Sequence, residues 1–369
     1  MDTLNLIKSK RQKTVLMSLA ALMLSSSLGH ASYDLREEDQ RSLINAHQLL
    51  TSVEGRNIRA GVIDGFFDPQ SDTYNVLSQA TKDAYQGRNA RQVVYNAQMN
   101  GHDHANHVAS SIHNVAPQTE LRVIDLNNDP SVLQAGQGNA RLIAALYEAI
   151  RAKLDFVNIS LRIAPDYDWN GAITQDIKAA FLRARDAGIG IIKSAGNDQE
   201  FTGSSAYTRS LVELLEEMNG SMILAAATEY NPDGQYEKLA SFSKGRINLQ
   251  TGKIKLDRYG NPILARGSNL AGLAYDYTIT TPGKNNYAYG ADNLRMSMSG
   301  TSMAAPIATG AACLIKNVHP ELSSREVLGY ILKSARTKSL QDNLDLPAGK
   351  YGRGALDVNQ ALTMIKKDR

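Results

Sequence analysis

The chain has 369 residues, of which 43% are hydrophobic and 21% are charged, and this composition lies within the range of globular proteins. Its formal net charge is +3, and the first 31 residues account for all of it, because four basic side chains there oppose one aspartate. A neutral remainder gives no electrostatic reason to expect nucleic acid or an anionic membrane as a partner. Cys313 is the only cysteine, so an intrachain disulfide is excluded.

The N-terminus has the pattern of an export signal. Basic residues from Lys8 to Lys13 precede an apolar run from Val15 to Leu24, and Gly29 and Ala31 stand at the −3 and −1 positions of a cleavage site. The apolar run is shorter than a membrane-spanning helix requires. We expect removal of residues 1–31 and a periplasmic or secreted chain without stable membrane association. A retained membrane anchor is the alternative.

After the signal, short apolar runs that suit buried strands alternate with amphipathic patterns that suit helices. The expected strands are 59–63, 121–126, 155–160, 188–193 and 222–227, and the expected helices are 140–153, 173–187, 209–218 and 323–334. Ser323 and Glu326 form a capping box at the start of the last helix. This order predicts a parallel sheet covered by helices on both faces, with ligands bound outside the carboxyl ends of the strands.

One domain over residues 32–369 is the simplest division of the mature chain. Residues 245–274 have the character of an insertion, because residues 247–256 alternate around a Thr-Gly turn as a hairpin does. We expect this insertion to be an exposed decoration of the domain.

Two segments of chemical interest follow expected strands. Asp64 ends the first strand, where a buried carboxylate is costly without a partner. Asn197 comes directly after the fourth strand, in the sequence Ser194-Ala195-Gly196-Asn197. Since the carboxyl ends of parallel strands meet at one edge of a sheet, both side chains belong to the expected ligand-binding edge.

Two further segments open expected helices. The first holds His102, His104 and His107, and the second is Gly300-Thr301-Ser302-Met303-Ala304-Ala305-Pro306, at the start of the most apolar helix. Proline is tolerated in the first turn of a helix, so Pro306 predicts that Ser302 lies at the N-terminal end, where anionic character is favoured.

These four segments, in this order and at this spacing, resemble those of the subtilisin-like serine proteases, peptidase family S8. The segment around Ser302 is close to that family's nucleophile motif, and the tail from Tyr351 to Val358 resembles its closing motif. The resemblance runs from about residue 45 to residue 362. It implies a three-layer α/β fold, with a parallel sheet and helices on both faces.

Carried over residue by residue, the resemblance implies that Asp64, His104 and Ser302 form a catalytic triad and that Asn197 donates a hydrogen bond to the oxyanion. Histidine takes the serine proton near neutral pH, and the aspartate fixes the tautomer of its ring. We therefore expect a secreted, monomeric serine endopeptidase that cleaves protein or peptide substrates through an acyl-enzyme.

The resemblance also points to substrate-binding residues. In the family, a Ser-Leu-Gly-Gly segment pairs with the substrate backbone and walls the pocket for the residue before the cleaved bond. The corresponding residues here are Ser160, Leu161, Arg162 and Ile163, and Lys193 adds a second cation at the same strand ends. One hypothesis is that Arg162 narrows this pocket or selects an acidic substrate side chain. The alternative is that Arg162 points to solvent and the pocket stays apolar.

Two other functions remain open. Ala105 and Asn106 replace the usual Gly-Thr between the two motif histidines, and residues 66–68 replace small residues, so the chain could be an inactive relative used for binding. The three histidines could instead serve a metallohydrolase. The zinc-protease signature, however, spaces its histidines four apart and includes a glutamate that is missing here.

We expect no cofactor and no metal at the catalytic site. The strong calcium-binding loop of many relatives is missing, because only residues 111–114 separate Ser110 from Val115-Ala116-Pro117. A calcium site elsewhere, for example near residues 125–129, stays open. The stretch from Ser32 to Asp64 is about as long as the mature family domain uses, which leaves no room for a folding pro-domain.

Overall fold

The computed structural model describes residues 41, 44, 46, 57–65, 67, 102–126, 138–163, 171–230, 237–243, 266–290, 295–337 and 349–369. The expected signal at residues 1–31 lies outside this set, as do Phe66, Asp68 and the turn of the expected insertion.

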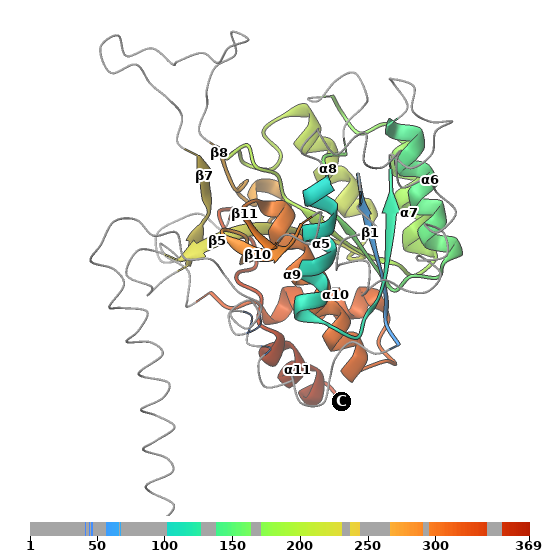
Figure 1. Cartoon of the computed structure of the whole chain (residues 1–369), viewed down its shortest axis with the longest axis vertical. Helices are drawn as coiled ribbons and strands as arrows, with labels where there is room; N and C mark the ends of the chain where they lie inside the picture. Colours follow the sequence, from blue (N-terminus) through green and yellow to red (C-terminus); the bar gives the residue numbers. More distant parts are fainter. Residues whose placement is uncertain are drawn as a thin grey trace, which may run out of the picture.

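A parallel sheet forms the middle layer of the molecule (Figure 1). Its strand order is β2-β1-β3-β4-β5, and β9 pairs in parallel with the other edge of β5. The bounds of these strands are β1 Arg59–Asp64, β2 Glu120–Asp125, β3 Phe156–Ile159, β4 Gly190–Ser194, β5 Met222–Tyr230 and β9 Thr278–Pro282. Strand β6 (Glu237–Leu239) pairs antiparallel with the end of β5. The five expected strands are confirmed in order and in direction.

Helices cover both faces of this sheet, which confirms the three-layer α/β class. One apolar layer lies under α5 (His102–Val115), α9 (Thr301–Val318), α10 (Ser324–Ser334) and α11 (Val358–Lys367). The other lies under α6 (Gly138–Arg151), α7 (Gln175–Asp186) and α8 (Ala206–Glu217). Neighbouring residues of one strand serve opposite layers, as Val62 and Ile63 of β1 do, because strand side chains alternate.

Smaller elements complete the molecule. Two antiparallel pairs join β10 (Asn286–Tyr289) to β11 (Arg295–Met298), and β7 (Ser241–Ser243) to β8 (Arg266–Gly267). A 3₁₀ helix, η4, covers Gly272–Tyr277. Nowhere in the described residues is there a helix with the length and apolar character needed to cross a bilayer.

Helix α9 runs through the apolar layer, and its residues from Met303 to Ile315 are buried. Its packing on α5 is close at Gly310, where a Cβ would lie 2.6 Å from the Cβ of Val115. Ser302 is the second residue of α9, so its N-terminal position is confirmed. Pro306 does not lie in the first turn as expected, because the helix begins at Thr301.

The capping box at α10 is confirmed. The Ser323 hydroxyl accepts from the backbone N–H of Glu326 at 3.2 Å, and the Glu326 carboxylate accepts from the backbone N–H of Ser323 at 2.7 Å. These two bonds satisfy donors that a helix start otherwise leaves unpaired.

The closing motif binds the free edge of β9. Arg353 N donates to Thr278 O at 2.8 Å, and Thr280 N donates to Gly354 O at 2.8 Å. Gly352 has a φ of +65°, and a Cβ placed on it would lie 2.3 Å from Thr278 O. Glycine is therefore required here both for its backbone conformation and for the close approach.

Gly352→Ala should lower the melting temperature, because the new methyl group meets a backbone oxygen that cannot move aside. Gly329→Ala in α10 is the matched control, since a Cβ there meets nothing within 4 Å. Alanine in a helix interior gains about 0.5–1 kcal/mol over glycine, so the control should be neutral or stabilised. Equal melting temperatures for the two variants in scanning calorimetry would contradict the tight contact.

Candidate active site

Asp64, which is buried, and His104, which is partly exposed, are in contact at the carboxyl edge of the sheet. Asp64 is the last residue of β1 and is only 2% exposed, while His104 lies in the first turn of α5. Nδ1 of His104 is 2.9 Å from Oδ2 and 3.1 Å from Oδ1 of Asp64. The backbone N–H of Gly65 donates to the same carboxylate at 2.8 Å. The contact occupies Nδ1 and leaves Nε2 as the ring atom for a second partner.

The electrostatics of the His104 and His107 imidazoles differ sharply. Burial lowers the pKa of His104, but the charge and hydrogen bond of Asp64 outweigh it, so the pKa is raised above 6.5. Burial lowers the pKa of His107 to about 4. His107 Nε2 contacts Asn286 O at 2.9 Å, so this neutral ring ties α5 to β10.

Ser302 and Ser160 exchange two hydrogen bonds. The Ser302 hydroxyl donates to Ser160 O at 3.1 Å, and the Ser160 hydroxyl donates to Ser302 O at 2.9 Å. Ser302 O can accept this bond because Pro306, four residues on, has no N–H to offer it. A side chain thus replaces the missing helical bond, which explains why proline is tolerated in the second turn of α9.

The Ser302 hydroxyl has its hydrogen bond to Ser160 rather than to His104 within the described residues. The structure therefore brings Asp64 and His104 into contact and fixes Ser302 on the end of β3. Active-site hydrogen bonds are often long or misaligned without substrate and tighten when it binds.

The Asn197 amide is oriented by Thr301. Its Oδ1 accepts from the backbone N–H of Thr301 at 2.9 Å and from the Thr301 hydroxyl at 2.9 Å. Because a backbone N–H can only donate, the amide nitrogen Nδ2 must face the other way. A Cβ built on Gly300 would lie 3.6 Å from Nδ2 and 3.6 Å from the backbone nitrogen of Ser302. Two N–H donors thus converge on the space beside Gly300.

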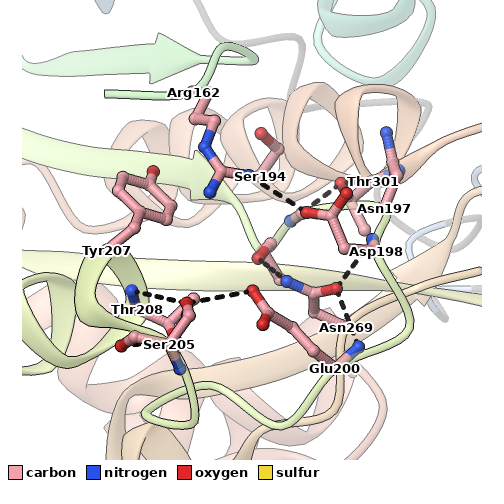
Figure 2. A network of polar contacts seen from close by, with 12 residues as sticks. Arg162, Ser194, Asn197, Asp198, Glu200, Ser205, Tyr207, Thr208, Asn269 and Thr301 are labelled. Carbon is pink, nitrogen blue, oxygen red and sulfur yellow. Dashed lines mark hydrogen bonds and ion pairs between the residues drawn. The ribbon is translucent and has the colours of Figure 1, made fainter. Parts of the chain in front are cut away.

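Asn269 holds the loop that carries Asn197, and sequence reasoning missed it. Its side chain is 1% exposed; Nδ2 donates to Ala195 O at 3.1 Å, and Oδ1 accepts from Asp198 N at 2.9 Å. Figure 2 shows this amide inside the loop. Gly196 has a φ of +110°, and a Cβ there would lie 2.4 Å from Asn269 Nδ2.

The position of Asn269 changes the interpretation of the expected insertion. The turn of that insertion lies outside the described residues, but residues 267–269 near its end are buried in the domain, whereas Leu273 is 70% exposed. No spacing rule connects residue 269 to a loop more than seventy residues earlier. The one available signal was the Gly-Ser-Asn run at residues 267–269, directly before Leu270 and Ala271.

The expected substrate-binding residues follow β3. Ser160 is the partner of Ser302, and Leu161 packs against the layer under α6–α8. Arg162 does not point to solvent, because its guanidinium lies 4.1 Å from the centre of the Tyr207 ring and 3.1 Å from Asp198 Oδ2 (Figure 2).

The described departures from the family motif, Ala105, Asn106 and Phe67, are buried residues. Ala105 and Asn106 are both fully buried within the fold. Phe67 is also buried, and its backbone N–H donates to Asp125 at 3.2 Å. Residues 111–114 belong to the last turns of α5.

The histidine cluster does not assemble as a metal site in the described part of the chain. His104 and His107 contact Asp64 and Asn286 respectively. The described residues contain no group of three His, Cys, Asp or Glu side chains that could hold a metal ion. The side chain of His102 lies outside this description.

Comparison with known proteins defines the class of this protein. The model of the subtilase family, Peptidase S8, matches residues 55–354, and the chain therefore belongs to this family of serine-type peptidases. Subtilisin DY from Bacillus licheniformis is 24% identical over 318 residues, which cover 84% of this chain and 92% of that protein. A thermostable alkaline protease from Halalkalibacterium halodurans is 28% identical over 244 residues, covering 63% of this chain and 52% of that protein.

Solved structures confirm the fold. The PatG macrocyclase in complex with peptide has a TM-score of 0.59 at 16% identity, covering 91% of this chain and 99% of that one. A variant of the protease domain of PatA has a TM-score of 0.57 at 18% identity, covering 86% and 99%. At such identities the likeness concerns the fold alone.

The two imidazoles should titrate far apart in an NMR experiment on the ring carbons. We expect a pKa above 6.5 for His104 and about 4 for His107. Asp64→Asn should lower the pKa of His104, because burial then acts without the opposing carboxylate, and should leave His107 unchanged. Matching pKa values for His104 in both proteins would show that Asp64 does not set its charge.

Proposed function

We propose that this subtilase is an endopeptidase that hydrolyses peptide bonds through an acyl-enzyme on Ser302. In this proposal His104 is the general base, Asp64 orients its ring, and Asn197 stabilises the oxyanion. The observation that carries the proposal is the convergence of Asn197 Nδ2 and Ser302 N beside Gly300. Such paired donors next to a serine hydroxyl suit the negative oxygen of a tetrahedral intermediate.

The reaction begins when the Ser302 hydroxyl leaves Ser160 O and gives its proton to Nε2 of His104 as its oxygen attacks the substrate carbonyl carbon. The carbonyl oxygen becomes negative and accepts hydrogen bonds from the two donors. Asp64 stabilises the imidazolium through Nδ1. His104 then returns the proton to the leaving amine, and a water molecule repeats the sequence to free Ser302.

The pattern of residues 1–31 supports the further proposal that the chain is exported and acts in a periplasm or outside the cell. The residues after them then form a single peptidase domain. Its substrates would be folded or unfolded proteins and peptides met after export.

One observation favours a second function. The bond from the Ser302 hydroxyl to Ser160 O is also what an inactive scaffold used for peptide binding would retain. Labelling by a fluorophosphonate reagent separates the two functions, because only a serine activated by its base reacts.

Ser302→Ala should lower turnover of a peptide substrate by about 10⁴-fold or more and abolish fluorophosphonate labelling, because it removes the atom that forms the acyl bond. Unchanged turnover in this variant would overturn the mechanism. A metal chelator should leave wild-type turnover intact. Loss of turnover on chelation, with no effect of Ser302→Ala, would instead favour the metallohydrolase.

Gly300→Ala should lower kcat by about 10²–10³-fold while the protein stays folded, because the methyl group occupies the space between the two oxyanion donors. Its distance of 3.6 Å from each donor is ordinary van der Waals contact, and the extended backbone of Gly300 accepts alanine. Kinetics of the two proteins at equal melting temperature provide the measurement. An unchanged kcat would locate the oxyanion elsewhere.

A further inference from the structure

A charged bridge spans the two segments beside Ser302. Ser160, which touches Ser302, is followed two residues later by Arg162, and Asn197 is followed by Asp198. Arg162 Nη1 and Asp198 Oδ2 are 3.1 Å apart and connect the two segments. An acyl group on Ser302 would lie near Ser160 and Asn197, and the bridge joins residues that follow these two by two positions and by one position.

The positive side of the bridge is enclosed, and the negative side is open to water. The Arg162 side chain is 19% exposed, whereas Asp198 is 48% exposed. Figure 2 shows the guanidinium between the Tyr207 ring and the Asp198 carboxylate. The Tyr207 hydroxyl accepts from Ile163 N at 3.2 Å, so the ring is held under the cation. Stacking on an aromatic ring leaves the edge of a guanidinium free for a carboxylate.

Lys193 is a second cation, close enough to Arg162 for the two charges to interact. Lys193 on β4 is 2% exposed, and its ammonium group has Ser194 O, at 2.8 Å, as its hydrogen-bond acceptor in the described structure. Burial, together with the charge of Arg162, lowers the pKa of Lys193 to about 7, while Asp198 opposes this shift. Glu200, the other carboxylate near Tyr207, is engaged by the hydroxyls of Ser204 and Ser205. Hydrogen bonds from hydroxyls leave the charge of Glu200 in place, so Arg162 and Lys193 share this region with two carboxylates, and Asp198 lies within ion-pair distance of Arg162.

A substrate carboxylate fits this arrangement better than an apolar side chain does. A carboxylate accepts two parallel hydrogen bonds from a guanidinium and relieves the repulsion between Arg162 and Lys193. The face of the buried Tyr207 ring is covered by Arg162, so it does not offer a stacking surface to an aromatic side chain of a substrate.

We propose that the enzyme prefers an acidic side chain immediately before the scissile bond, and that this side chain displaces Asp198 from Arg162. The proposal rests on the proposed function, since it needs an acyl-enzyme on Ser302. Asp198 acts in the free enzyme as an internal substitute for the substrate carboxylate, and Arg162 and Lys193 determine the preference.

The test uses peptides that differ only in the residue before the cleaved bond, which is Glu, Gln, Ala or Phe. Active enzyme is counted with the fluorophosphonate reagent. We expect kcat/KM for Glu to exceed that for Gln by about 10- to 100-fold, as a hydrogen bond between charged groups provides. Arg162→Gln should reduce this ratio to near one, and Asp198→Asn should raise it by removing the competing carboxylate. Arg185→Gln, on the surface of α7, is the matched control and should keep the ratio of the original protein.

Two results in the labelled original protein would overturn the acidic preference: a ratio of kcat/KM for Glu to that for Gln near one, or faster cleavage after Phe or Ala than after Glu. Neither result would contradict the acyl-enzyme mechanism. An unchanged ratio in labelled Arg162→Gln would overturn the role of Arg162. If that variant fails to fold, the same measurement is made on Asp198→Asn and Arg162→Lys. An unchanged Glu-to-Gln ratio of kcat/KM in both variants would overturn the proposal. If the original protein neither reacts with the fluorophosphonate reagent nor cleaves any of the peptides, the proposed function itself is wrong.

Discussion

The buried start of α9 is the constraint on which the site depends. A helix start leaves backbone donors without helical partners, and burial makes each unpaired donor costly. Here Thr301 N is satisfied by the Asn197 side chain, and the carbonyl group of Ser302, freed by Pro306, is satisfied by Ser160. The residues that satisfy this helix start are thus also neighbours of Ser302, the proposed nucleophile.

This arrangement explains how one packing contact fixes several distances at once. α9 packs on β3, β4 and α5, and the last residues of those strands therefore meet its first turn. Asp64, at the end of β1, is placed opposite His104 at the start of α5 by the same convergence. Any shift of α9 along its axis would change the Ser302–Ser160 pair and the Asn197–Thr301 contact together. The packing of α9 thus positions Ser302, the proposed nucleophile, together with the contact that orients Asn197.

Charge in the site is arranged in two groups with different partners. In the Asp64–His104 pair the carboxylate is buried and raises the pKa of the imidazole, which suits the proposed role of His104 as a group that accepts and releases a proton. The Arg162–Asp198 bridge is enclosed on its positive side and open on its negative side. An open carboxylate is readily solvated when it leaves, whereas a buried guanidinium needs a replacement. Asp198, which is 48% exposed, is therefore easier to exchange for an external carboxylate than Asp64, which is 2% exposed.

The sequence by itself determined the strand and helix order, the edge of the sheet where Asp64, Ser160 and Asn197 gather, and the N-terminal position of Ser302 on its helix. These features follow from local periodicity and from short motifs, in which each residue's role depends on near neighbours. Only the tertiary structure decided the partner of Ser302 O, the role of Asn269 and the orientation of Arg162 over Tyr207. Each of these contacts joins residues far apart in the chain, and side-chain packing selects among many polar partners that the sequence offers equally.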